Sequence, residues 1–580
     1  MSSVQNKFPS IDRDQWRAMV TATMKNMNSK SLDRVDEDGL KINALYEIQG
    51  HESADAGKNM GAACAITRLP VNPEAHLAYG WDICQPVSAD GPAEQTNRLI
   101  LDELSDGVGT IRLEQMPTAN LAPDLPIMMR DVLLPAVGID LDSGNDVMAH
   151  LAGFSNFAKT QNKSLSDLRF SANIDPFAPD AARSLLDDGL EYFAETNADN
   201  TPFGLFRTNG WVWHNRGMTT VQELAFMFAS LVEIMRGGMA RGLDLSDLAS
   251  RLSASLALPA DLFDGIAKCR ALRRGWGGIV SALGLEPDAH RLFLQGAVSV
   301  RMFSLADDEV NMLRTTTALL GGAIGGADQL SAHAHDCLGG STAAGRRLAR
   351  MQQHLLIEES GLARSLDAAG GAGFIEARSD QLADAAWRYF QKIEADGGAK
   401  AAHLSGQFDL LAKKAAGQRH SRLAAGDLAL LGVNLQPDGR PITSSLPRWQ
   451  KLRRPAAAIE DLRRSAAQNP PRILLLQQGN KPSPQLVKLR ALLAIGGIQP
   501  VQMHPDDINE KAVTSAQPDL VILAEDNFET LAPPVKIGLR DLHRAGKVIT
   551  GAAIIGASGP LEILGKLVGI SLEKYRKGEA

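Results

Sequence analysis

A repeated alternation of two kinds of apolar stretch constrains this chain most strongly. Stretches of strand length are followed by longer stretches with helical apolar spacing, from about residue 76 to about residue 370. The predicted helices include 93–107, 180–195, 220–238 and 308–324. The predicted strands are 76–84, 109–115, 136–142, 168–174, 203–209, 251–258, 291–300 and 326–334. Eight strands with eight crossovers predict a TIM (β/α)8 barrel. A doubly wound sheet is the alternative, which we disfavour because no Gly-x-Gly-x-x-Gly opens the first unit.

The alternation resumes near the C-terminus after a long interruption. Strands are predicted at 472–478, 498–503, 519–525 and 547–555, with helices between them. Four strands with short crossovers predict a small flavodoxin-like α/β domain. We therefore divide the chain into an N-terminal segment (1–70), a barrel (71–398), a partly helical linker (399–470) and the small domain (471–580). Within the N-terminal segment we expect a helix over 14–27 and a strand at 40–48.

Composition and charge exclude several classes of protein. The 580 residues are 44% hydrophobic and 22% charged, as is usual for globular domains, and the net charge of -7 leaves no basic surface for nucleic acid. The four cysteines are far apart, so neither a metal knuckle nor a disulfide framework is expected. The N-terminus lacks an apolar signal core, and no stretch reaches the roughly 20 apolar residues of a membrane span. We expect a soluble cytoplasmic protein.

The first turn of the small domain poses a chemical question. The strand 473–476 leads through Gly479 into the loop 480–484 and then a helical pattern, which is the layout of a ligand-binding βα turn. The loop contains no His, Asp or Cys, and it has no further glycine to approach a phosphate. The turn therefore has the layout of a binding site without an evident ligand-binding group.

Two segments carry a specific resemblance. The first segment, 299–330, contains Asn311, Arg314, Thr315, Thr316, Gly325 and Gly326. The second segment, 354–398, contains Glu358, Glu359, Ser360, Gly370, Gly371, Phe374 and Glu376. This pattern closely resembles the methylmalonyl-CoA mutase family, in which an Asn-x-x-Arg-Thr-Thr helix precedes a Gly-Gly turn. A later helix of that family runs into a glycine loop and an aromatic strand. Residues near the start resemble the opening of the family's small subunits: Phe8, Trp16, Asp38, Gly39, Tyr46, and Gly80 to Ile83 followed by Gln85.

The resemblance implies a reaction and a cofactor. The family interconverts methylmalonyl-CoA and succinyl-CoA through radicals from adenosylcobalamin, with the acyl-CoA in the barrel and the corrin on the C-terminal domain. Catalytic chains supply the cobalt ligand from an Asp-x-His-x-x-Gly loop after the first strand of that domain. Alignment on Gly479 places Lys481, Ser483 and Leu486 at the Asp, His and Gly positions. The nearby His504 follows the second strand and is more simply a surface residue.

Two further positions of the family pattern are altered in the barrel. A Tyr-His pair normally contacts the substrate thioester; here Trp211 and Val212 stand at those positions, and valine offers no donor. His214 lies two residues on and would substitute if it faced the same side of a strand. The family's Thr-Met-Tyr-x-x-Arg-Pro-Trp run aligns on Trp81.

In the stretch of this chain that aligns with the family's Thr-Met-Tyr-x-x-Arg-Pro-Trp run, Glu74, Ala75 and His76 stand at the start. Tyr79 stands where the family has Arg. Cys84 replaces the following Arg. Neither a phenol nor a thiol replaces a guanidinium that binds a carboxylate.

We interpret the chain as the non-catalytic small subunit of a heterodimeric methylmalonyl-CoA mutase. It is expected to have no catalytic, cofactor-binding or metal-binding residue, with adenosylcobalamin in the partner large subunit. The N-terminal segment and the Arg-rich stretch 448–464 are the parts expected to wrap that partner. A solvated tail and spacer are the alternative for them. Two other functions stay open: an independent acyl-CoA-binding or regulatory protein, and a mutase with an altered site that uses His214. The sequence leaves open whether the barrel centre admits a CoA ester.

Three other features have simpler structural explanations. His333 and His335 are spaced for one strand face, but no third metal ligand is evident. The pairs Gly321-Gly322 and Gly325-Gly326 are better explained by a helix end and a tight turn than by a phosphate site. The Met and Phe residues within 223–235 have the spacing of a helix that packs on the barrel.

Overall fold

The structure of the chain is a computed structural model. It describes residues 11–24, 32–46, 80–196, 201–442, 449, 451–476, 483–503, 507, 510–524, 533–555 and 560–578.

Eight parallel strands close into a barrel in the order β10-β3-β4-β5-β6-β7-β8-β9. The strands are β3 (Asp82–Ser88), β4 (Thr110–Glu114), β5 (Gly138–Asp142), β6 (Phe170–Ile174), β7 (Gly204–Asn209), β8 (Leu252–Leu258), β9 (Phe293–Val298) and β10 (Gln329–Ser331). Leu330 of β10 lies opposite Ile83 of β3 and Gly296 of β9, which closes the ring. The predicted barrel is confirmed, and the doubly wound sheet is wrong for this part of the chain.

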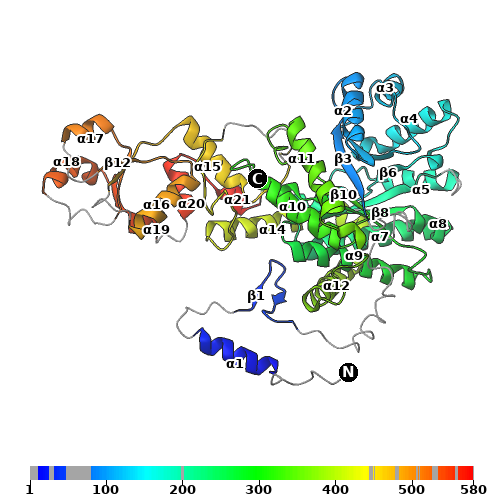
Figure 1. Ribbon diagram of the computed structural model, residues 1–580, viewed down its shortest axis with the longest axis horizontal. Coiled ribbons are helices and arrows are strands. Elements are labelled where there is room, and N and C mark those ends of the chain that lie inside the picture. Colours follow the sequence, from blue (N-terminus) through cyan, green and yellow to red (C-terminus); the bar gives the residue numbers. More distant parts are fainter. Residues whose placement is uncertain are drawn as a thin grey trace.

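Helices surround the barrel (Figure 1). They are α2 (Ala93–Ser105), α3 (Leu121–Met128), α4 (Val147–Thr160), α5 (Leu185–Glu195), α6 (Gly210–Asn215), α7 (Thr220–Ala240), α8 (Leu245–Ser250), α9 (Leu262–Ala282), α10 (Val310–Ile324), α11 (Ala343–His354) and α12 (Gly373–Ala395). The four predicted helices are confirmed. Phe374 was expected on a strand, which is wrong: it stands in the first turn of α12, a helix packed on α7 and α9.

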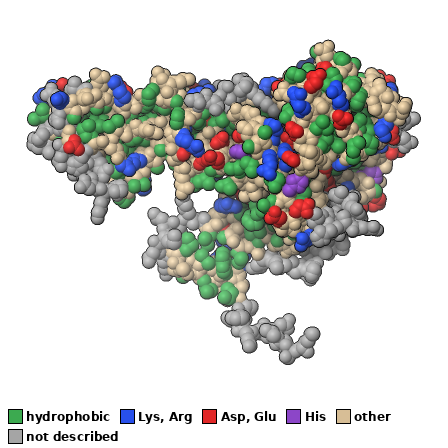
Figure 2. Space-filling view, turned by 45° about the horizontal axis from the view of Figure 1, so that its top comes forward, with side chains coloured by type: hydrophobic (Ala, Val, Ile, Leu, Met, Phe, Trp, Pro, Cys, Tyr) green, Lys and Arg blue, Asp and Glu red, His purple; other side chains and the backbone are tan. Residues whose placement is uncertain are grey.

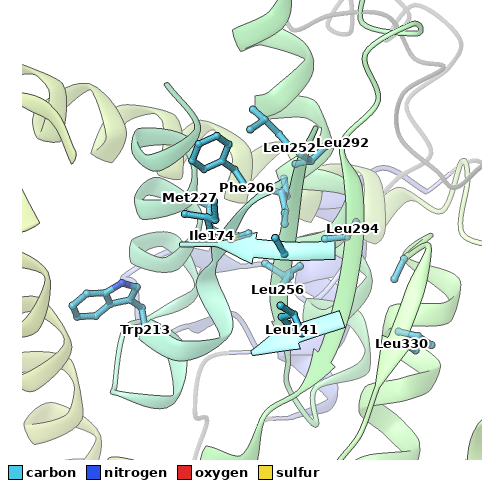
Figure 3. Packing of buried hydrophobic residues seen from close by; sticks show 14 of the residues in the cluster. Leu141, Ile174, Phe206, Trp213, Met227, Leu252, Leu256, Leu292, Leu294 and Leu330 are labelled. Carbon is cyan, nitrogen blue, oxygen red and sulfur yellow. The ribbon is translucent and has the colours of Figure 1, made fainter. Parts of the chain in front are cut away.

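The hydrophobic core lies between the strands and this helical layer. All seven residues of β8 are buried, because strands covered on both sides by neighbouring elements expose neither face. Figure 3 shows Leu141, Ile174, Phe206, Leu256 and Leu294 converging from several strands in this layer. Close helix packing requires glycine at one point: a Cβ at Gly275 of α9 would lie 2.1 Å from the ring of Phe228 on α7. The Met and Phe residues within 223–235 of α7 are buried here, as predicted.

The N-terminal segment contributes one helix and a short hairpin. α1 (Arg13–Thr23) has no buried residue, and Figure 1 shows it apart from the barrel. β1 (Arg34–Val35) and β2 (Lys41–Ile42) form an antiparallel pair. The helix predicted over 14–27 is confirmed for residues 14–23, and residues 25–27 lie outside the described residues. The strand predicted at 40–48 is reduced to two residues, and 47–48 lie outside the described residues.

The hairpin turn is acidic and binds to the same chain. Asp36 bonds to Arg378 of α12 at 2.6 Å, and Glu37 bonds to Arg419 at 2.6 Å. Asp38 accepts from the backbone N–H of Val221 at 3.2 Å, in the positively polarised first turn of α7. These contacts attach the hairpin to its own barrel.

A helical linker connects the barrel to a second, smaller sheet. The linker helices are α13 (Gly398–Leu404), α14 (Gln407–Ala424) and α15 (Ala457–Gln468). The sheet has the parallel order β12-β11-β13-β14, with β11 (Ile473–Leu476), β12 (Val501–Met503), β13 (Leu520–Leu523) and β14 (Val548–Thr550). The order 2-1-3-4 is that of the first four strands of flavodoxin-like sheets.

Helices accompany this sheet, which lies at the left in Figure 1. They are α16 (Pro484–Ile495), α17 (Glu510–Ala516), α18 (Pro533–Arg544), α19 (Gly551–Ile555), α20 (Pro560–Leu567) and α21 (Glu573–Arg576). The strand predicted over 547–555 is wrong in its second half, since 551–555 form α19. None of the described helices combines the length and apolarity needed to cross a membrane.

Candidate functional site

The barrel interior is filled by polar side chains. Arg207 of β7 forms a two-pronged ion pair with Asp140 of β5, at 2.8 and 3.1 Å. Gln295 of β9 donates to Asp140 at 2.9 Å and to Gln329 of β10 at 2.5 Å. We name these four residues the polar core; each is at most 4% exposed. Strands from opposite sides of the ring are therefore joined directly across the barrel axis.

Electrostatics keep the polar core ionised. Burial alone would raise the pKa of Asp140, but the adjacent guanidinium of Arg207 outweighs burial and lowers the pKa below its ordinary value. Asn173 donates to the same carboxylate at 2.8 Å, and Ser255 donates to Gln295 at 3.0 Å. Side chains thus satisfy one another in the middle of the barrel, so this layer is a packed core and not an open channel.

Three aromatic rings pack together near the carboxyl ends of the barrel strands. Trp211 stacks on His333, with ring centroids 5.8 Å apart and planes 24° apart. Trp449 of the linker meets the same imidazole edge-on at 5.1 Å. The indole N–H groups donate to backbone carbonyls, Trp211 to Val298 at 2.8 Å and Trp449 to Cys337 at 2.9 Å. We name Trp211, His333 and Trp449 the aromatic cap.

A cavity of about 710 Å³ lies beside this cap, between β3, α2 and α11. Its lining includes the carboxylates of Asp90 and Glu114 and one arginine, Arg346. That guanidinium is engaged by Glu103 at 3.1 Å and by the carbonyl of Ser341 at 2.8 Å.

The nearby N-terminus of α11 is also occupied, by the carboxylate of Asp336 and the side chain of Thr342. Arg346 and the N-terminus of α11 therefore already have partners within this chain.

His214 does not take the place of the missing substrate histidine. The assumption that it lies on a strand is wrong: residues 210–215 form α6, whose N-cap is Asn209. The ring is 2% exposed, and its Nδ1 lies 2.8 Å from the carboxylate of Glu223. Burial, together with the cations Arg301 and Lys268, lowers the pKa of His214 well below its ordinary value. A neutral imidazole that donates to Glu223 has a structural role.

Trp81 and Cys84 also have structural contacts. Trp81 is buried and donates to Gln353 at 3.1 Å. Cys84 is fully buried, and burial raises the pKa of its thiol well above the ordinary value, so it is not a reactive thiolate. Glu74, Ala75, His76 and Tyr79 lie outside the described residues.

At the altered turn of the small domain, Ser483 is the N-cap of α16. Its hydroxyl accepts from the backbone N–H of Leu486 at 3.1 Å. Leu486 is fully buried in the core of the small domain. A capping serine and a buried leucine do not suit adenosylcobalamin, which the family pattern binds through a histidine and a glycine at these positions. Gly479, Lys481 and His504 lie outside the described residues.

The buried position of Leu486 leads to a stability prediction. Leu486→Ala is expected to destabilise the small domain by roughly 2–5 kcal/mol, because it leaves a cavity in a closed core. Val487→Ala is the matched control on the same helix; Val487 is 54% exposed, and a change within about 0.5 kcal/mol is expected. Urea unfolding followed by circular dichroism checks this. Equal effects of the two substitutions would contradict the core role of Leu486.

The other candidates that the sequence singles out are also structural. Asn311 is fully buried; it accepts from the backbone N–H of Ser304 at 3.0 Å and donates to the carbonyl of His335 at 2.9 Å. His333 lies 3.2 Å from Glu114, and no group of three potential metal ligands occurs among the described residues. Gly325 ends α10, and Gly326 turns with φ of +83°. Gly321 and Gly322 lie inside α10, and a Cβ added at Gly321 would lie 3.5 Å from the Cα of Gly265 on α9.

The polar core is the feature that sequence reasoning missed. Asp140, Arg207 and Gln295 each stand in the interior of a predicted barrel strand. A charged or amide residue in the middle of a buried strand is the signal that identifies such a position.

The fold and the site define an α/β protein with a closed β/α barrel, whose centre is filled, and a smaller parallel sheet. The family model described as methylmalonyl-CoA mutase matches residues 121–470. The chain belongs to the methylmalonyl-CoA mutase family, a family of isomerases, as the resemblance in the sequence indicated.

Relatives agree with this assignment. The chain is 32% identical over 552 residues to the probable methylmalonyl-CoA mutase small subunit of Mycobacterium tuberculosis, covering 87% of this chain and 86% of that one. It is 31% identical to the methylmalonyl-CoA mutase small subunit of Streptomyces virginiae, covering 75% and 72%. It is 24% identical to the mitochondrial methylmalonyl-CoA mutase of Homo sapiens, covering 72% and 60%. The resemblance to small subunits is thereby confirmed.

Proposed function

We propose that this chain is the non-catalytic small subunit of a heterodimeric, adenosylcobalamin-dependent methylmalonyl-CoA mutase of the cytoplasm. Its task is to stabilise a related large subunit, which binds the cofactor and carries out the reaction. A partner that binds only the folded state of the large subunit stabilises that state by mass action.

The observation that carries this proposal is the polar core. Asp140, Arg207 and Gln295 occupy the barrel axis and are bonded to one another. A ligand on that axis would have to separate a buried ion pair, and leaving one of its charges without a partner costs about 3–5 kcal/mol. The filled axis leaves no passage for the acyl-CoA that the family resemblance places in the barrel, and this supports a scaffold role.

The small domain supports the same proposal. The turn after β11 uses Ser483 as a helix cap and Leu486 as a core residue. Neither side chain supplies an imidazole nitrogen for cobalt.

The parts that contact the large subunit are expected to be α1 and its flanks. Ile11 and Met19 are 52% and 58% exposed. In Figure 2, hydrophobic side chains lie on the small lobe below the barrel, where Figure 1 places α1. The linker arginines instead bind this chain: Arg454 to Glu460 at 2.7 Å, and Arg463 to Asp438 at 2.7 Å. Because the hairpin and these arginines bind this chain, we restrict the partner-wrapping role to α1 and its flanks.

The test is to purify the chain alone and co-expressed with the large subunit, and to record cobalamin absorbance and isomerisation of methylmalonyl-CoA. We expect no corrin and no turnover for the lone chain, and both in a one-to-one complex. The control is the large subunit alone, which should be less stable or less active than the complex. Cobalamin bound by the lone chain, or turnover by it, would disprove the proposal.

A further inference from the structure

The outer surface of the barrel carries an apolar stripe on α11. Leu348, Met351 and Leu355 follow one another at intervals of three and four residues, so they share one helix face. They are 38%, 46% and 49% exposed. Helix faces of this kind normally pack against another element.

Exposed apolar side chains also occur on the elements next to α11. Gln352 of α11 donates to the carbonyl of Met312 at 2.8 Å and to the hydroxyl of Thr316 at 2.9 Å, which holds α10 beside α11. Leu313 of α10 is 61% exposed. Leu431 of the linker is 40% exposed, and its carbonyl accepts from Arg314 at 2.7 Å. We name Leu313, Leu348, Met351, Leu355 and Leu431 the α10–α11 patch.

The opposite side of α11 is fixed, so the helix cannot rotate to bury the stripe. Arg350 is buried and binds Glu103 of α2 and Asp106, and Arg346 binds Glu103 at 3.1 Å. Rotation would remove these partners from buried charges, which is strongly unfavourable. The patch therefore stays at the surface of the lone chain, where an apolar surface of this kind marks an interaction site.

We propose that the α10–α11 patch is a docking surface for the large subunit. This inference rests on the proposed function and adds the place of contact. The relatives most similar in sequence are named as small subunits, so a protein subunit is the partner that the comparisons favour. Beside the stripe, Glu358 and Glu359 are exposed. Arg347, four residues before Met351 on α11, is exposed as well, so the rim carries charges of both signs and the apolar side chains are the main feature of the surface.

The test is co-purification of the untagged large subunit with a tagged form of this chain. Met351→Glu combined with Leu355→Glu introduces two carboxylates into the patch. The matched control is Met239→Glu: Met239 lies on α7, is 54% exposed, and is separated from α10 by α9. Circular dichroism and thermal unfolding of each lone chain are expected to match the unchanged protein, because all three positions are at the surface.

We expect M351E/L355E to reduce recovery of the large subunit at least about tenfold, since unpaired carboxylates in a buried interface are strongly unfavourable. M239E is expected to recover normal amounts. If M351E/L355E recovers as much large subunit as the unchanged chain does, the docking surface is overturned while the proposed function stands.

If the unchanged chain recovers no large subunit, both proposals fail. If the lone chain dimerises and M351E/L355E abolishes that dimer without affecting recovery of the large subunit, the patch takes a second copy, and the proposal is again overturned.

Discussion

Glu223→Gln is expected to lower the free energy of unfolding of the barrel by about 3–5 kcal/mol, because it leaves a buried cation without its partner. The carboxylate of Glu223 accepts from Lys268 at 2.5 Å and from the backbone N–H of Ala257 at 2.9 Å. Both side chains of the ion pair are fully buried. Burial raises the pKa of Glu223 and lowers the pKa of Lys268, so each needs the other's charge to remain ionised.

Two further variants separate this effect from a general sensitivity of α7. Glu233→Gln, on the same helix, removes a partner of Arg236, whose side chain is 47% exposed, and a loss below about 1 kcal/mol is expected. Glu223→Gln combined with Lys268→Met removes both charges, and recovery of a large part of the stability is expected. Chemical denaturation of the three proteins at one pH checks this. Equal losses for the two single variants would show that the buried ion pair contributes no more to the free energy of unfolding than the exposed pair does.

Arg207→Met is expected to destabilise the barrel by a similar amount, about 3–5 kcal/mol at neutral pH, by leaving Asp140 buried without its cation. In the unchanged protein the pKa of Asp140 is lowered. The ionised carboxylate thus stabilises the fold above the ordinary aspartate pKa, and this stabilisation is lost as the pH falls through the lowered value. Without Arg207, burial dominates and raises the pKa, so the folded variant takes up a proton more readily than the unfolded chain does.

The pH dependence of the difference is the decisive measurement. The loss caused by Arg207→Met is expected to shrink as the pH is lowered from 7 toward 4, since protonation neutralises the stranded carboxylate. Asp140→Asn combined with Arg207→Met should be more stable than Arg207→Met alone at pH 7. Unfolding free energies measured across this range test both statements. A loss that does not change with pH would mean that Asp140 is already neutral beside Arg207.

The sequence predicts the barrel well because strand and helix periods are local properties. Each barrel strand is a short apolar stretch such as 252–258, and each covering helix repeats its apolar residues at the helical interval. The ends are less well predicted. Residues 551–555 are apolar enough for a strand, but they form the helix α19. Phe374 is likewise apolar, but it lies in the first turn of the helix α12.

The site is predicted only in part. Comparison with the family pattern identifies Ser483, Val212 and Cys84 as altered positions. In the structure, Ser483 caps a helix and Cys84 is buried in the core. The role of His214 depends on whether residues 210–215 form a strand or a helix, which the sequence alone does not decide.

The sequence by itself determined the order of elements, the two sheets and the family, since these depend on periodicity and on short motifs along the chain. Only the tertiary structure decided what fills the barrel. In the sequence, Arg207 lies 67 residues from Asp140 and 88 residues from Gln295. In the structure, the three side chains meet on the barrel axis. Ring closure brings β5, β7 and β9 together around that axis, and charges buried in so narrow a space must pair with one another.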